Sequence, residues 1–152
     1  MKKKSFITLL LVALAVLTLT VVAVQADSES DAYFKKLLSC SSSGVYYEDQ
    51  FEPFLKDPSL VGGDEWNELV AYMRSDNGIT CGYISSRPPE EGLDDYADDL
   101  YDAAHFTTIG LEFRVLALEN PKIADILNAE ADRLLTKADE LFGKILSEVD
   151  LG

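Results

Sequence analysis

The chain has 152 residues, which is enough for one domain with a single hydrophobic core. It carries 27 Asp and Glu residues against 13 Lys and Arg residues, a net charge of −14. Such a chain is repelled by nucleic-acid phosphates and by anionic membrane surfaces, so neither is expected as a partner.

The first 26 residues have the layout of a secretory signal peptide. Three lysines precede an apolar run from Phe6 to Val24, and small residues at Val24-Gln25-Ala26 fit a signal-peptidase site. We expect residues 1–26 to be removed, leaving one acidic helical domain over residues 27–152. The apolar run approaches the ~20 residues that span a bilayer, so an uncleaved membrane anchor is the alternative. Both interpretations place the domain outside the cytoplasm, in a secreted or periplasmic location.

Removal of this segment would make the domain more acidic. Its three lysines would be lost with it, so ten of the 13 basic residues would face all 27 acidic ones, a net charge of −17. This charge favours cations or basic proteins as partners, although it also simply promotes solubility.

Two cysteines, Cys40 and Cys81, remain in the exported part. An even, small number of cysteines in an exported protein indicates a disulfide. There is no Cys-x-x-Cys motif and no nearby histidine to activate a thiol. We therefore predict a structural Cys40–Cys81 bridge.

The N-terminal half of the domain is predicted to be irregular and rich in aromatic residues. A capping-box pattern precedes a short helix from Asp31 to about Ser41, and serines and Gly44 follow it. A second amphipathic helix is expected from Glu65 to Arg74. Residues 79–84 are predicted to be extended, and residues 85–89 to form a linker.

The C-terminal half gives a firmer prediction of two long helices. The first runs from residue 90 or 93 to Leu118, and the second follows Asn120-Pro121 and ends near Glu148. A loop of a few residues forces an antiparallel hairpin. The predicted fold is therefore all-α: a compact, four-helix, bundle-like domain built on this hairpin. The second half of the first long helix is apolar nearly all round, so we expect it to be buried on both sides.

One face of the first long helix could bind a divalent metal ion. Asp102 and His105 are one helical turn apart, and Asp98 precedes them on the same face. The alternative is an ordinary solvated face, with carboxylates near the positive end of the helix dipole. A chain with a single histidine excludes the di-iron carboxylate chemistry that needs two Glu-x-x-His motifs.

Two further features leave alternatives open. The spacing from Asp57 to Glu68 weakly matches a calcium-binding loop, but Val61 lacks a ligand oxygen, and a helix-capping loop is the alternative. The N-terminal half also holds aromatic residues that could form either a small core or a surface groove for a peptide, sugar or helix. These are Tyr46, Tyr47, Phe51, Phe54, Trp66, Tyr72 and Tyr83.

The sequence holds no recognised catalytic motif and none for binding an organic cofactor. We therefore expect neither enzymatic activity nor catalytic residues, and no cofactor. The leading hypothesis is an exported domain that binds another protein at or outside the cell envelope. The alternatives are a divalent-cation binder that uses Asp98, Asp102 and His105, and an enzyme that uses acidic residues.

Overall fold

A computed structural model of the chain describes residues 31–148. The chain divides into two units, residues 1–34 and residues 35–152, and the account below concerns the second unit, here called the bundle. The predicted signal segment (residues 1–26) lies outside the described residues. The prediction that it is cleaved therefore stays a prediction.

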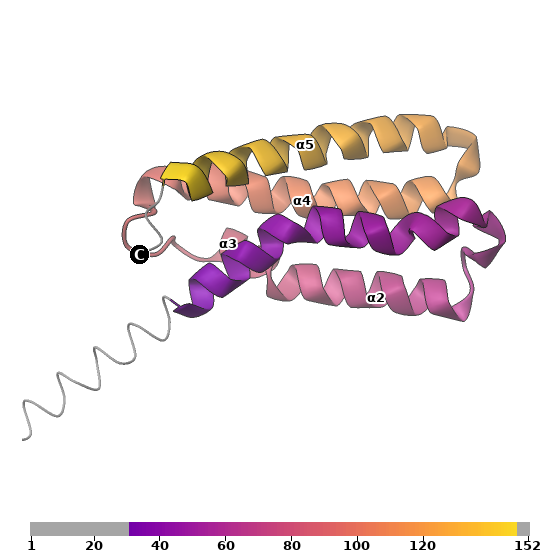
Figure 1. Cartoon of the computed structure of the whole chain (residues 1–152), viewed down its shortest axis with the longest axis horizontal. Coiled ribbons are helices and arrows are strands. Elements are labelled where there is room, and N and C mark those ends of the chain that lie inside the picture. Colours follow the sequence, from indigo (N-terminus) through magenta and orange to yellow (C-terminus); the bar gives the residue numbers. More distant parts are fainter. Residues whose placement is uncertain (1–30, 149–152) are drawn as a thin grey trace, which may run out of the picture. The chain divides into compact units, whose positions relative to one another are not determined.

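The described part of the bundle is helical, and no strand occurs among residues 31–148. This confirms the predicted all-α, bundle-like fold (Figure 1). The chain is helical from residue 31 to residue 56, and we call residues 35–56 the first helix. The other elements are η1 (Pro58–Leu60), α2 (Asp64–Ile79), α3 (Cys81–Ser86), η2 (Asp94–Tyr96), α4 (Ala97–Glu119), η3 (Pro121–Ile123) and α5 (Ala124–Glu148).

The predicted hairpin is formed by α4 and α5, which run antiparallel side by side (Figure 1). Small residues let the two helices approach closely. Gly110 of α4 faces Leu135 of α5 so tightly that an added Cβ would lie 2.8 Å from Leu135 Cγ. Gly44 of the first helix meets the same leucine, with an added Cβ 3.4 Å from Cδ2. One leucine side chain thus packs against glycines of two other helices.

The first helix is much longer than predicted, because it continues past Ser41 to residue 56. The serines that suggested a stop are accommodated by hydrogen bonds to the preceding turn. Ser41 Oγ donates to Leu38 O at 2.9 Å, and Ser43 Oγ donates to Ser39 O at 2.8 Å. The predicted irregular aromatic segment is therefore mostly helix, and Gly44 serves close packing within it.

Residues 79–84, predicted to be extended, are also helical apart from Thr80, which forms a turn. Thr80 separates α2 from α3, and both its N–H and its Oγ1 donate to Asp76 O at 2.8 Å. An isolated extended segment would leave its backbone N–H and C=O groups without partners. The β-branched residues here therefore form a short helix.

The core lies among the first helix, α2, α4 and α5. One cluster of its buried side chains consists of Tyr47, Phe51, Phe54, Trp66, Val70, Met73, Leu111, Val115 and Leu135. The indole Nε1 of Trp66 donates to Glu119 Oε1 at 3.2 Å, which links α2 to the end of α4. The predicted Cys40–Cys81 disulfide is present and joins the first helix to α3, with 4.9 Å between the two Cα atoms.

One side of α4 is less buried than the sequence predicted. Leu111 and Val115 are fully buried, but Phe106, Ile109 and Phe113 are only half-buried, and Leu116 is 40% exposed. The expectation that the second half of this helix is buried on both sides is therefore wrong. Within residues 35–148 the first helix, α2 and α3 pack on the side of Leu111, and no described segment fully covers the opposite side.

No helix among the described residues is both long enough and apolar enough to cross a membrane.

Candidate functional site

The three predicted metal ligands all lie on α4 with exposed side chains. The ring of His105 stacks on Tyr101, with 5.8 Å between ring centroids and 14° between planes. Within residues 31–148, no three His, Cys, Asp or Glu side chains lie close enough together to hold a metal ion. A metal site at Asp98, Asp102 and His105 stays a prediction.

Asp57, the first residue of the possible calcium-binding loop, has a structural role. The Asp57 carboxylate accepts hydrogen bonds from Ser59 N at 3.1 Å and Ser59 Oγ at 2.6 Å, and it caps η1. These two hydrogen bonds lower the pKa of Asp57. Glu65 and Glu68, the later candidate ligands, lie within α2. This part of the chain behaves as a helix-capping loop.

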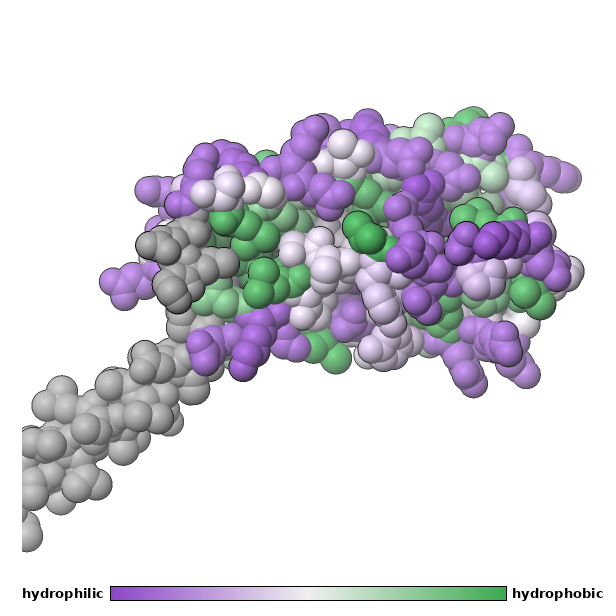
Figure 2. Space-filling view, in the orientation of Figure 1, coloured by the Kyte–Doolittle hydropathy of each residue, from purple (hydrophilic) through white to green (hydrophobic). Residues whose placement is uncertain are grey.

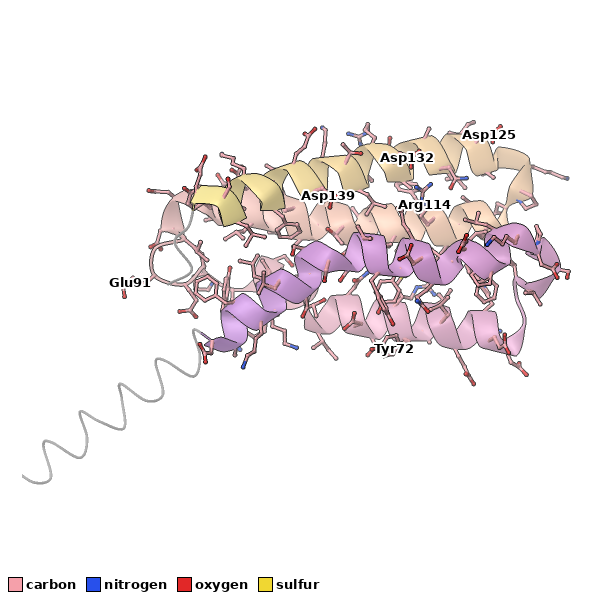
Figure 3. All side chains as sticks on the ribbon, viewed as in Figure 1. Tyr72, Glu91, Arg114, Asp125, Asp132 and Asp139 are labelled. Atoms are coloured by element: carbon pink, nitrogen blue, oxygen red, sulfur yellow. A yellow bond between two sulfur atoms is a disulfide. The ribbon has the colours of Figure 1, made fainter. Side chains whose placement is uncertain are left out.

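The aromatic cluster divides between core and surface. Tyr47, Phe51, Phe54 and Trp66 belong to the core, whereas Tyr46 and Tyr72 are exposed. The hydroxyl of Tyr47 donates to Asp76 Oδ2 at 2.8 Å, and burial, this hydrogen bond and the Asp76 charge raise the pKa of Tyr47. Tyr46, Tyr72 and Asp76 border a cavity of about 220 Å³ lined with serines. Tyr72 projects outward from α2 in Figure 3.

Arg114 links α4 to the first helix and to α5 (Figure 3). It donates from Nε at 3.0 Å and from Nη2 at 2.6 Å to Glu48 Oε1, and from Nη1 at 2.9 Å to Asn128 Oδ1. Nη2 also bonds to Asp132. Burial lowers the pKa of Arg114, but Glu48 and Asp132 outweigh it and raise the pKa overall. All three guanidinium nitrogens have acceptors, so Arg114 holds α4 in position against the first helix and α5.

Asp139 of α5 lies near the hydrogen bonds of Arg114, and its surroundings disfavour the ionised form of its carboxyl group. Burial of its carboxyl group, and then repulsion by Glu48, raise the pKa of Asp139 above the ordinary value of 3.8. Because the folded state binds this proton more tightly than the unfolded state, ionisation above pH 3.8 reduces stability. Asp139→Asn is therefore expected to raise the midpoint of urea unfolding at neutral pH, and the gain should vanish as pH falls below 3.8.

Asp132→Asn is the matched control for Asp139→Asn, because Asp132 accepts a hydrogen bond from Arg114. It should lower the unfolding midpoint at neutral pH. An Asp139→Asn gain that persists below pH 3.8 would contradict the electrostatic explanation.

The incompletely covered side of α4 is a candidate binding surface of the bundle. We call it the α4 stripe, and it consists of Phe106, Ile109, Phe113 and Leu116. The intervals of three, four and three residues equal those of a coiled-coil seam, which places all four side chains along one line of the helix. Ile123 of η3 follows seven residues after Leu116 and is 50% exposed.

A broad depression of about 750 Å³ runs beside the α4 stripe, between Phe113 and the start of α5. Its α5 side includes Ile126, which is 72% exposed, together with Leu127 and Ala129. Asp125 and Glu130 add negative charge at its edge. Two cations near it have partners: Arg133 pairs with Glu130 at 2.5 Å, and Lys137 Nζ lies 5.8 Å from the ring centroid of Phe106.

The far end of the α4 stripe is also acidic. Asp98 and Asp102 lie on the same side of α4, within the two turns that precede Phe106, and both are exposed. The predicted metal face therefore continues into the α4 stripe. The result is an apolar line with carboxylates at both ends. By contrast, the face shown in Figure 2 is mostly hydrophilic, with separate apolar patches.

The apolar character of the stripe residues was evident in the sequence, but their exposure was not. Periodicity shows that a helix is apolar on two sides, and it gives no information on whether other helices cover both. The fold defines the class of this protein as a disulfide-linked, all-α bundle. No protein family, curated protein or solved structure matches the chain.

Proposed function

We propose that this protein is an exported, non-catalytic binding domain that holds a basic amphipathic helix of another protein on the α4 stripe. The observation that carries the proposal is the incomplete covering of four large apolar side chains at coiled-coil spacing. Exposed apolar surface of this kind is costly in water, and in a soluble protein it marks an interaction site.

Charge determines which partner fits this surface. Acidic groups flank both ends of the α4 stripe, and the whole chain carries a net charge of −14. A second copy of the chain would bring the same negative charge to the interface, and like charges oppose association. A helix with apolar residues along one face and lysines or arginines beside them would complement both features.

The location is part of the same proposal. The Cys40–Cys81 disulfide is weakly suggestive of an oxidising compartment outside the cytoplasm. Mass spectrometry of the N-terminus of the native protein distinguishes a chain cleaved after Ala26 from one that keeps the apolar run as an anchor.

A synthetic helical peptide tests the binding proposal. The probe is a peptide of about 21 residues with leucine at the a and d positions and lysine at most others. We expect it to bind saturably and to shift the backbone amide NMR signals of Ile109, Phe113 and Leu116. A peptide of the same pattern with glutamate in place of lysine should not bind, because its charge has the same sign as the domain.

Two matched variants localise the binding. Leu116→Asp places a charge on the α4 stripe, whereas Leu38→Asp makes the same change on the first helix at a leucine of similar exposure (48% against 40%). We expect Leu116→Asp to weaken peptide binding at least about tenfold, or ~1.4 kcal/mol, and Leu38→Asp to have little effect. Equal loss in both variants would contradict the assignment. If the wild-type protein formed a dimer that Leu116→Asp dissociates, the partner on the α4 stripe would be a second copy of the chain and not a basic helix.

A further inference from the structure

A second candidate site is the cavity between the first helix and α2, on residues other than those of the α4 stripe. Its lining comes from three serines and a tyrosine of the first helix and from two residues of α2: Ser39, Ser42, Ser43, Tyr46, Tyr72 and Asp76. Its volume of about 220 Å³ is several times the ~30 Å³ that one molecule of liquid water occupies, so it has room for a small organic group.

Two exposed tyrosine rings flank this cavity from different helices. Tyr46 is 50% exposed and Tyr72 is 60% exposed. The buried ring of Tyr47 contacts both, because its centroid is 4.9 Å from that of Tyr46 and 6.4 Å from that of Tyr72. The two exposed rings are therefore no farther apart than the sum of these distances. A cation is attracted to an aromatic ring within about 6 Å of its centroid, so one cation between the rings would be in reach of both.

Asp76 supplies a negative charge at the same cavity. Its Oδ2 accepts a hydrogen bond from the buried hydroxyl of Tyr47 at 2.8 Å, which holds the carboxylate in place. Within residues 31–148 this part-buried carboxylate forms no ion pair with a Lys, Arg or His side chain, and no basic residue lines the cavity. A part-buried charge of this kind is stabilised by an opposite charge, so the cavity favours a cation.

The serines of the wall add acceptors. Ser42 Oγ donates to Ser39 O at 3.1 Å, and Ser43 Oγ donates to the same carbonyl at 2.8 Å. These two hydroxyl protons are engaged within the helix, which leaves only the oxygen lone pairs for a ligand. An anion would find no guanidinium or ammonium group on this wall. A neutral sugar would use the rings but would not offset the charge of Asp76.

We infer that this cavity binds a trimethylammonium group, with the rings of Tyr46 and Tyr72 against its methyl groups and Asp76 opposite its charge. Aromatic faces attract quaternary ammonium ions, whose charge is covered by apolar methyl groups. The net charge of −14 also draws cations toward the domain. The group can belong to a small free molecule or to a trimethylated lysine, since both present the same chemistry.

Calorimetry and NMR with choline chloride test this inference. Choline is expected to bind saturably at one site and to shift the backbone amide signals of Ser43, Tyr46 and Tyr72. The alcohol 3,3-dimethylbutan-1-ol has the same shape, with carbon in place of the charged nitrogen. It should bind at least about tenfold more weakly. Equal binding of this alcohol would overturn the inference, because it would show that the charge has no part in recognition.

Three further titrations separate the remaining explanations. Sodium chloride at the same ionic strength should not reproduce the choline shifts, and if it did, they would reflect only general attraction to an acidic surface and the inference would fail. Methyl β-glucoside should not bind, and its saturable binding in place of choline would assign the cavity to a sugar. A blocked peptide with one trimethyl-lysine is the arm for the source of the group. Tighter binding of this peptide than of choline would assign the trimethylammonium to a protein side chain.

A pair of variants at Tyr72 tests the role of the ring. Tyr72→Leu removes the aromatic face and should weaken choline binding at least about tenfold. Tyr72→Phe keeps the face and loses only the hydroxyl, so it should bind choline nearly as the wild type does. Equal loss in both variants would contradict the assignment, because it would show that the hydroxyl and not the ring contacts the ligand. Since Tyr72 is 60% exposed, neither change should lower the melting temperature.

Asp76→Asn tests the role of the charge. It keeps an oxygen that can accept from Tyr47, and it should also weaken choline binding at least about tenfold. Tyr101→Leu is the control, because Tyr101 is a 50% exposed tyrosine of α4 that does not line this cavity, and it should change binding little. Leu116→Asp, which tests the α4 stripe, should leave choline binding unchanged. The two proposals therefore succeed or fail independently.

Discussion

Replacing Cys40 and Cys81 together with alanine is expected to lower the free energy of unfolding by about 4 kcal/mol. The bridge joins residues 41 apart in sequence, so it restricts a long loop of the unfolded chain. Since small domains are stable by only about 5–15 kcal/mol, this is a large share of the total. Urea unfolding followed by the fluorescence of Trp66, the one tryptophan and fully buried, measures the change.

Reduction of the wild-type protein provides the control for the double cysteine variant. A reducing agent should shift the wild-type midpoint to that of the variant and leave the variant itself unchanged. If the variant unfolded at the wild-type midpoint, the bridge would contribute nothing to stability. Both cysteines are fully buried, so reduction should require prior opening of the fold.

The second large effect is expected from Gly110→Ala. The new Cβ would lie 2.8 Å from Leu135 Cγ and 2.9 Å from Leu135 Cδ2, well inside van der Waals contact. Overpacking of a core costs about 1–3 kcal/mol, while alanine recovers up to ~1 kcal/mol of helix propensity. We expect a net loss of about 1 kcal/mol, and at most about 2 kcal/mol, in the free energy of unfolding.

Gly143→Ala is the matched control for Gly110→Ala, because it makes the same change on α5 at an exposed position with open space around the new Cβ. It should stabilise the protein by ~0.5–1 kcal/mol. A double-mutant cycle with Leu135→Ala should show that the penalty at Gly110 disappears when the leucine is shortened. If the loss of stability from Gly110→Ala persisted in the presence of Leu135→Ala, contact with Leu135 would not be its cause.

The sequence predicted the α4–α5 hairpin well, because long periodic segments with a short connection permit few arrangements. It missed Gly110 and Gly44 as packing positions, since a glycine has no side chain to enter a hydrophobic pattern. It also placed a stop at Ser41, because serine and glycine favour turns when considered locally. The hydrogen bonds of the serines to the previous turn, and the leucine that fits against Gly44, depend on the folded state.

The candidate sites were predicted less well for a related reason. His105 was chosen for its distance from Asp102 along one helix, and in the structure it borders a cavity formed with α2 and α3. Asn77 had no distinguishing mark in the sequence beyond a place in a turn-like Asp-Asn-Gly triplet. In the structure its side chain lines this cavity and is only 3% exposed, because residues distant in sequence bury it. Likewise, Phe106 and Leu116 resemble core residues until the helices that cover α4 are located.

The acidic ends of the α4 stripe have a consequence for the rate at which a partner arrives. Long-range attraction between opposite charges raises association rates, and dissolved salt weakens it. Apolar contacts along the stripe persist in salt and govern how long a complex lasts. In the proposed complex, added salt should therefore slow capture of a basic helix while changing its residence time much less. Charge would govern the encounter, and the four apolar side chains would govern retention.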